Sequence, residues 1–208
     1  MQYKKPKYGH GRGSNMNPSH CFDPHKHAQI TWSGQLPHWT QENVMQFVTF
    51  RLADSLPQSK LKEFEIEKQE WLENHSKPYS VDELMEYQEL FDKKDEWLDA
   101  GYGECLLSIA EIQDIVVCAF DHYDGERYEL FDYVIMPNHI HFLIIPGTGY
   151  ELGKIMKGIK GYTAREINKF LQRKGRVWEK EYWDRMIRSV EDYKSKKEYI
   201  KNNPSYKK

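Results

Sequence analysis

Two apolar runs separated by only three residues are the feature that most constrains how this chain folds. The first run is Tyr128–Ile135, the second is His139–Ile145, and Met136-Pro137-Asn138 lies between them. Runs of this length that are rich in β-branched and aromatic residues and are interrupted by a turn signal are typical of paired strands. The sequence therefore predicts a β-hairpin with a short link.

Two histidines stand at the start of the second predicted strand. Because alternate residues of a strand share a face, His139 and His141 point to one side while Ile140 and Phe142 point to the other. Imidazoles about 6 to 7 Å apart along a strand can share a divalent cation when further ligands arrive from another segment. The alternative is two buried histidines, each hydrogen-bonded to a neighbour, which costs desolvation without adding apolar burial. The pattern favours a metal pair.

Other segments predict one more strand and several helices. Gln46–Leu52 alternates well enough to be a strand and is followed by a Ser-Leu-Pro turn. Helical periods recur in five further segments: Leu61–Leu72, Val81–Leu98, Glu104–His122, Leu152–Leu171 and Glu191–Asn202. Residues 1–40 show no sustained period, so we expect a mostly irregular N-terminal arm there.

Length and composition bound the class of protein. With 208 residues, of which 39% are hydrophobic and 14% aromatic, the chain suits one domain with an elaboration. The three cysteines, Cys21, Cys105 and Cys118, form no CxxC pair, which argues against a disulfide framework or a zinc knuckle. No apolar run reaches the roughly 18 residues of a membrane span. We therefore expect a cytoplasmic protein with no membrane partner.

The net charge of −2 hides a strong segregation of charge along the chain. Residues 151–208 contain 17 Lys and Arg against 8 Asp and Glu, whereas residues 54–104 contain 15 acids and 6 bases. A basic region beside a divalent metal suggests a phosphodiester substrate, because Lys and Arg neutralise backbone phosphates and release their counterions. The alternative is a merely solvated helical surface. The acidic segment is not expected to touch nucleic acid.

A tyrosine and an asparagine near the end of the chain are candidates for the same site. On a helix Tyr199 and Asn203 are four residues apart and lie on one face, so a phenol and an amide oxygen could reach one place. Asn203 precedes Pro204, which disfavours the helical conformation, so its side chain is expected to project from a helix end. The alternative is a surface pair at a fraying terminus.

Taken together, these segments resemble the HUH single-tyrosine transposases of the IS200-like kind, and specifically the REP-associated tyrosine transposase branch. The matching elements are Val48–Leu52, Met136–His141, Gly161–Arg165, Val177-Trp178, Asp184–Arg188 and Tyr199–Pro204, in family order. The resemblance implies a transposase domain over residues 41–204. This chain departs from the family pattern by a helical insertion at about residues 54–102, and only a short tail, residues 205–208, follows the domain.

The resemblance implies an α+β fold, namely a ferredoxin-like antiparallel sheet flanked by helices. It implies that His139, His141 and Asn203 are metal ligands and that Tyr199 is the nucleophile. The implied cofactor is a divalent metal, Mg²⁺ or Mn²⁺, which would polarise a nonbridging phosphate oxygen. The implied reaction is attack of the phenol on a DNA phosphorus, which leaves a covalent 5′-phosphotyrosine and a free 3′-OH.

The expected partner is single-stranded DNA that carries hairpin or palindromic elements, bound by a monomer or homodimer at the nucleoid. Candidates for backbone contacts are Lys154, Lys157, Lys160, Arg165 and Arg176. The rings of the stretch 177–183 either belong to the core or stack on bases. Two other functions stay open: a protein that binds structured DNA without cleaving it, and a metal-dependent nuclease that uses water.

Overall fold

A computed structural model describes residues 7–13, 16–33, 36–76, 79–80, 82–83, 85–87, 90 and 97–203 of the chain. Its centre is a five-stranded sheet in which every pair of neighbouring strands is antiparallel. In spatial order the strands are β1 (Lys7–His10), β5 (Tyr128–Ile135), β6 (His139–Pro146), β4 (Gln46–Arg51) and β7 (Trp183–Met186). The predicted hairpin is therefore confirmed as β5 and β6.

Four of these strands and two helices form a ferredoxin-like core. Along the chain, the core runs β4, α3 (Ala110–Asp121), β5, β6, α4 (Leu152–Phe170) and β7. This is a β-α-β-β-α-β unit, and its strands lie side by side in the order β5, β6, β4, β7. The expected α+β fold, an antiparallel sheet flanked by helices, is confirmed.

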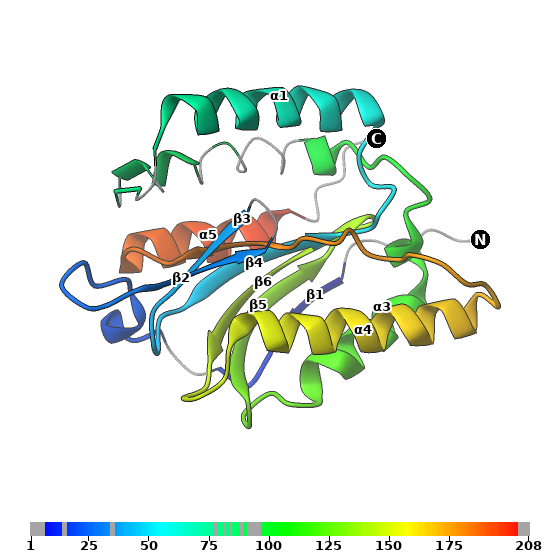
Figure 1. Cartoon of the computed structure of the whole chain (residues 1–208). Coiled ribbons are helices and arrows are strands. Elements are labelled where there is room, and N and C mark those ends of the chain that lie inside the picture. Colours follow the sequence, from blue (N-terminus) through cyan, green and yellow to red (C-terminus); the bar gives the residue numbers. More distant parts are fainter. Residues whose placement is uncertain are drawn as a thin grey trace.

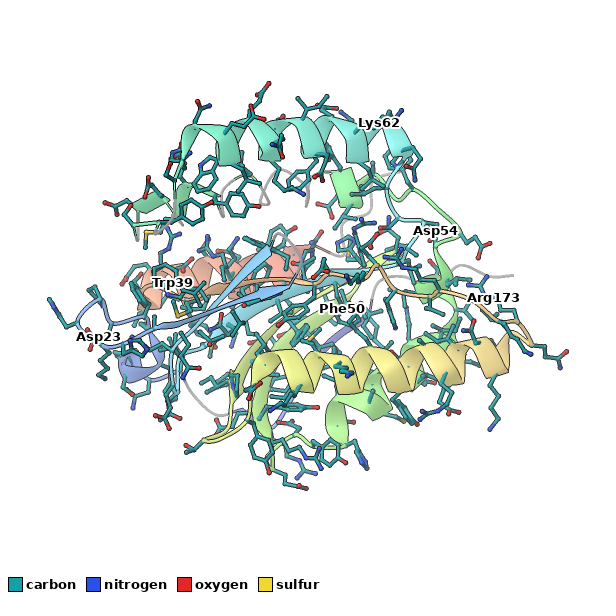
Figure 2. All side chains as sticks on the ribbon, in the orientation of Figure 1. Asp23, Trp39, Phe50, Asp54, Lys62 and Arg173 are labelled. Carbon is teal, nitrogen blue, oxygen red and sulfur yellow. The ribbon has the colours of Figure 1, made fainter. Side chains whose placement is uncertain are left out.

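The two faces of the sheet carry different layers (Figure 1). On one face α3 and α4 cover a core to which the sheet contributes Phe50, Ile140 and Phe142, and Phe50 lies between the sheet and α4 (Figure 2). On the other face α5 (Val190–Asn202) packs through Ile200 against Phe47. Because residues of β6 alternate between these layers, the faces predicted for its histidines and apolar residues are confirmed.

The acidic insertion lies on the same side of the sheet as α5 (Figure 1). Its first helix, α1 (Gln58–Asn74), confirms and extends the predicted helix, and Phe64 and Trp71 pack with Trp183 of β7. Of the second predicted helix, residues 82–83, 85–87, 90 and 97–98 are helical, and the others lie outside the described residues. Within the described ranges, no helix is both long and apolar enough to cross a membrane.

The expectation of an irregular arm over residues 1–40 is wrong for much of its described part. β1 pairs with β5, and β2 (Gln29–Ser33) pairs with β3 (Leu36–Thr40) in a separate two-stranded sheet. Gly9 lies opposite Tyr133, and a Cβ on Gly9 would collide with that ring. The glycine that resembles a loop signal in the sequence is what allows the backbone of β1 to approach β5 closely.

The helix predicted over Glu104–His122 is shorter than expected. A 3₁₀ turn occupies Leu106–Ser108, and α3 begins only at Ala110. Cys105 has a φ of 53°, in the left-handed region, which interrupts any helix that would start before it. The predictions for α4 and α5 are confirmed to within a residue at each end.

Three side chains fix where α5 starts and how it lies on the sheet: Ser189 just before the helix, and Asp192 and Lys197 within it. Ser189 caps the helix by accepting a hydrogen bond from the backbone N–H of Asp192 at 3.1 Å, and Asp192 accepts one from the N–H of Arg188 at 2.9 Å. Further along, Lys197 forms an ion pair with the buried Asp132 of β5 at 3.4 Å. Asp192 also pairs with Arg185 of β7, so the start and the middle of α5 are both tied to the sheet.

We expect Ser189→Ala to lower the free energy of unfolding by about 1 kcal/mol, because the helix loses its N-cap acceptor. Urea unfolding measures this change. Ser195→Ala is the matched control, since Ser195 is exposed within the same helix and alanine is the better helix former. Equal losses in both variants would show that Ser189 does not act as a cap.

Candidate active site

The structure brings His139, His141 and Tyr199 together, although they come from distant parts of the chain. The two imidazoles on β6 have ring centroids 4.6 Å apart. The hydroxyl of Tyr199, on α5, lies 3.4 Å from Nε2 of His141, at the outer limit of a hydrogen bond. A helix-borne phenol therefore faces the paired imidazoles on the α5 side of the sheet. The chemical roles assigned to these residues stay predictions.

The protonation of His139 is set by its neighbours. The side-chain nitrogen of Asn138 donates to the carbonyl oxygen of Tyr102 at 3.0 Å, so the amide oxygen of Asn138 faces Nδ1 of His139, at 2.7 Å. Because that oxygen can only accept, Nδ1 must carry the proton. Nε2 of His139 is then left with a free lone pair, which is the form that binds a metal.

His141 is held from two sides. Its Nδ1 lies 2.8 Å from the hydroxyl of Thr49 on the neighbouring strand, and its ring stacks on Phe47 with centroids 5.5 Å apart. When Nδ1 donates to Thr49, Nε2 presents its lone pair toward Tyr199. Each imidazole thus has a hydrogen bond at Nδ1 and an acceptor nitrogen at Nε2.

Both histidines are fully buried, at 0% exposure. Burial lowers the pKa of His139 to about 3. Burial also lowers the pKa of His141 well below its usual value, with smaller contributions from His139 and from the ammonium group of Lys196. Both rings are therefore neutral at pH 7, as metal ligation requires.

The imidazole nitrogens of His139 and His141 fit a divalent metal, but two donors do not make a complete set of ligands. Nε2 of His139 is buried and has no hydrogen-bond partner within the described ranges. The same ranges contain no group of three His, Cys, Asp or Glu side chains close enough to hold a metal. A third ligand must therefore be of another type or must move into place.

Two side chains could complete the site. Asn203 follows α5 as its C-cap, one turn beyond Tyr199, and its side-chain nitrogen is buried without a hydrogen-bond partner in the described structure. Asp99, from the acidic insertion, places a carboxylate oxygen 3.7 Å from Nε2 of His139. The sequence argument did not single out Asp99, because nothing in an acidic segment indicates which carboxylate reaches the sheet.

Lys196 is a second residue that sequence reasoning missed. Its ammonium nitrogen lies 4.8 Å from the centroid of the Phe47 ring and 5.7 Å from that of Tyr199. It precedes Tyr199 by three residues, so the two side chains share a face of α5. This spacing is the feature of the sequence that could have identified Lys196. Lys196 places a positive charge next to the phenol.

The structure separates four of the five predicted DNA-binding residues from the histidines and Tyr199. Four of them, Lys154, Lys157, Lys160 and Arg165, belong to α4, which covers the opposite face of the sheet from α5 (Figure 1). Lys157 is exposed, whereas Lys154 pairs with Glu151 at 2.7 Å. Arg165 lies 3.4 Å from Glu166. DNA contacts by these residues would lie away from Tyr199.

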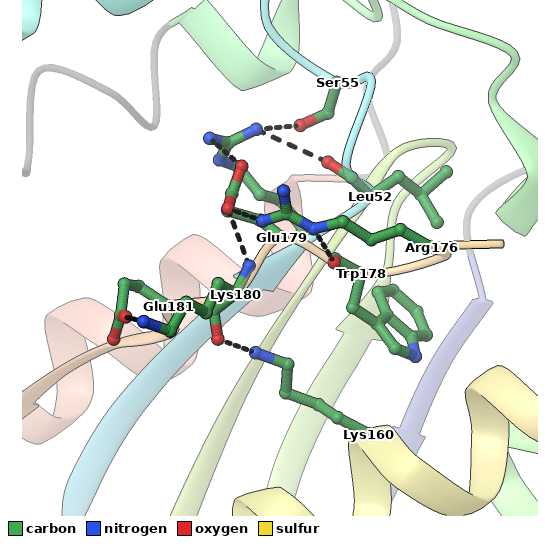
Figure 3. Close-up of polar contacts among 9 residues, drawn as sticks. Leu52, Ser55, Lys160, Arg176, Trp178, Glu179, Lys180 and Glu181 are labelled. Carbon is green, nitrogen blue, oxygen red and sulfur yellow. Dashed lines mark hydrogen bonds and ion pairs between the residues drawn. The ribbon is translucent and has the colours of Figure 1, made fainter. Parts of the chain in front are cut away.

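Lys160 and Arg176 also organise the loop that follows α4 (Figure 3). Lys160 donates to the backbone carbonyl of Lys180 at 2.7 Å, and burial lowers its pKa to about 8. Arg176 pairs with Glu179, which also accepts from Arg51 at 3.0 Å. Both cations therefore have structural partners within the protein.

A protein-family model matches the part of the chain that contains most of this site. Residues 110–203 match the family described as transposase IS200 like. The matched segment contains His139, His141, Tyr199 and Asn203. Over these residues the chain is similar to the IS200-like transposases, in agreement with the resemblance noted in the sequence.

Two solved structures are similar to the chain. One is a REP-associated tyrosine transposase bound to a REP hairpin, with 15% identity and a TM-score of 0.40 over 77% of this chain and 66% of that one. The other is a candidate transposase from Deinococcus radiodurans R1, with 16% identity and a TM-score of 0.32 over 77% of this chain and 90% of that one. No curated protein matches the chain.

The buried neutral histidines predict a specific dependence of stability on pH. Because the pKa of His139 is lower in the folded than in the unfolded protein, its contribution is complete above about pH 6.5 and is lost as the pH falls toward 3. In EDTA, we expect the free energy of unfolding to fall less steeply over that range in His139→Gln than in the wild-type protein. The two slopes should differ by about 1.4 kcal/mol per pH unit. Urea titrations at several pH values measure this, and parallel slopes would contradict it.

Proposed function

We propose that this protein is a transposase that cleaves and rejoins single-stranded DNA through a covalent 5′-phosphotyrosine. The observation that carries the proposal is the approach of the Tyr199 hydroxyl to within 3.4 Å of Nε2 of His141. The family match over residues 110–203 supports the same conclusion from the sequence. The buried, neutral imidazoles supply the metal-binding half of the site.

Tyr199 acts as the nucleophile in this proposal. Its phenol oxygen bonds to a DNA phosphorus as the bond from that phosphorus to the departing 3′ oxygen breaks, and the two oxygens must stand in line. The result is a phosphotyrosine ester and a free 3′ hydroxyl. Attack by another 3′ hydroxyl reverses the step and joins strands without added energy.

The proton of the phenol must leave for the oxygen to attack. Nε2 of His141 is within reach of it, but the same lone pair is the one that would bind a metal. The two roles exclude one another at any one moment, so the proton passes to solvent when a metal is bound. The ammonium group of Lys196, 5.7 Å from the centre of the phenol ring, favours the negative charge that then develops.

A divalent ion, Mg²⁺ or Mn²⁺, held by His139, His141 and a third ligand, would polarise a nonbridging phosphate oxygen. The protein's own contribution is orientation. Asn138 and Thr49 fix the two rings, and α5 fixes the phenol. The DNA partner that we propose is a single strand bearing a hairpin, as in the REP-associated branch of the family.

We expect Tyr199→Phe to abolish the covalent adduct with labelled hairpin DNA in Mg²⁺ or Mn²⁺, because only the attacking oxygen is removed. Binding in EDTA should be unchanged. A denaturing gel detects the adduct, and Tyr162→Phe is the matched control because Tyr162 is exposed on α4.

Cleavage that survives in Tyr199→Phe would identify a nuclease that uses water. DNA binding by the wild-type protein without any cleavage would identify a binding protein that has kept the fold alone. Either result rejects Tyr199 as the nucleophile.

The third metal ligand can be assigned by the affinity for Mn²⁺, measured by calorimetry. We expect Asn203→Ala to weaken binding about tenfold, a loss of the size seen when metal-site partners are removed. Asp99→Asn is the competing variant, and Asp82→Asn is the matched control for loss of an exposed charge in the insertion. A loss in Asp99→Asn alone would assign the third ligand to the insertion instead.

A further inference from the structure

A cleft of about 580 Å³ opens at the edge of the sheet between α4, the loop 175–182 and the β2–β3 hairpin. A second hollow of about 730 Å³ shares four of its lining residues, namely Thr31, His38, Gly153 and Tyr182. The two hollows therefore adjoin. Volumes of this size are typical of small-ligand sites.

A buried histidine and a buried aspartate stand at the wall that the two hollows share. Nδ1 of His38, on β3, is hydrogen-bonded to a carboxylate oxygen of Asp184, on β7. His38 is 5% exposed and Asp184 is 0% exposed. When Asp184 is ionised, its carboxylate accepts, Nδ1 of His38 donates, and Nε2 of the neutral ring is left as an acceptor.

Nε2 of His38 is buried and makes no hydrogen bond within the described ranges. A buried polar atom without a partner is costly, so such an atom at the wall of a cleft indicates a ligand that supplies an N–H or O–H group.

Tyr182 adds a flat aromatic surface beside His38. The two rings stack with centroids 4.3 Å apart and an interplanar angle of 22°. Tyr182 is only partly buried and lines both hollows. Stacked rings at an open cleft suit the planar face of a nucleobase, whatever its identity.

The charges around the first cleft favour an anion. Its cationic lining residues are Lys157, Lys160, Arg176 and Lys180. Its two acids are already paired, Glu179 with Arg176 and Glu181 with Lys180 at 3.8 Å (Figure 3). Lys157 is exposed and lies on the α4 wall. The cleft thus combines a positive rim with an aromatic wall and an unsatisfied acceptor.

We propose that this cleft binds one unpaired nucleotide of a DNA strand, with its base against His38 and Tyr182 and its phosphate near Lys157. The proposal rests on the proposed function, because it names a part of the same DNA substrate. The cleft lies on the α4 side of the sheet, whereas Tyr199 lies on the α5 side. The bound nucleotide is therefore not the one that is cleaved, and it selects and positions the substrate instead.

The test is a double-mutant cycle between the protein and the DNA. The probe is a fluorescein-labelled DNA hairpin with short unpaired flanks, in EDTA so that no strand is cut, and single bases of the flanks are removed in turn. With the wild-type protein, we expect one abasic position to weaken binding about tenfold, from the loss of one stacked base. With His38→Asn, the same abasic position should cause no further loss.

Asparagine is the substitution of choice because its amide can still donate to Asp184. Fluorescence anisotropy gives the affinities, and thermal melting shows whether the variant folds. If His38→Asn does not fold, Tyr182→Leu takes its place in the cycle. Losses that multiply, so that the abasic site and the variant act independently, would overturn the cleft as the site of that base.

A second measurement tests the phosphate. Lys157→Gln should reduce the slope of log affinity against log salt concentration by about 1, as expected for one lost phosphate contact. Lys169→Gln, an exposed lysine on the same helix outside the cleft lining, is the matched control and should leave the slope unchanged. Equal slopes in wild type and Lys157→Gln would remove the phosphate from this wall.

The source of the nucleotide is tested by competition. Free deoxynucleoside monophosphates should displace the hairpin DNA only weakly, and strong displacement would make the cleft a free-nucleotide site and overturn the proposal. Wild-type protein that bound no hairpin DNA would overturn both this proposal and the proposed function. Independent losses in the cycle would overturn only the cleft.

Discussion

The burial of two neutral imidazoles in a central strand is the constraint on which the rest of the site depends. Taking polar rings out of water is unfavourable unless their nitrogens find partners. Asn138 and Thr49 supply those partners at Nδ1 of His139 and of His141, and each leaves an acceptor lone pair at Nε2. The hydrogen bonds that make burial tolerable are therefore the same ones that orient both rings, and they turn Nε2 of His141 toward Tyr199. One group of contacts therefore serves both the stability of the fold and the proposed chemistry.

The alternation of side chains along β6 then separates the molecule into a layer on each face of the sheet. Ile140 and Phe142 hold α3 and α4 on one face, so the histidines necessarily face the other layer. α5 and the insertion lie in that layer (Figure 1), and Met16 and Cys21 of the N-terminal segment pack against its core. A ferredoxin-like core keeps both of its own helices on one face, and it leaves the opposite face free for an added helix, here α5 with Tyr199. The position of Tyr199 thus follows from the topology together with the cap and ion pair that hold α5.

Periodicity predicted the long elements well, because β5, β6, α4 and α5 have patterns long enough to identify a face. It failed for β1 and the β2–β3 hairpin, which are short and rich in glycine, proline and histidine, and which pair with partners that no local pattern reveals. The residues His139, His141, Tyr199 and Asn203 could be singled out by type and spacing. Asp99 could not be, since its approach to His139 is a tertiary contact across the insertion. Sequence patterns identify faces, whereas contacts between distant segments require coordinates.

The basic character of residues 151–208 has to be interpreted differently once the faces are known. Lys196 lies with Tyr199 on the α5 side, whereas Lys157 lies on α4, so one segment of positive charge in the sequence becomes two surfaces in the fold. β7 is the edge strand between them, and the cleft beside His38 lies at that edge. A DNA strand that reaches both surfaces by way of this cleft has to bend around β7. Double-stranded DNA is far too stiff for so tight a path, which is a geometric reason for such a substrate to be single-stranded where it enters.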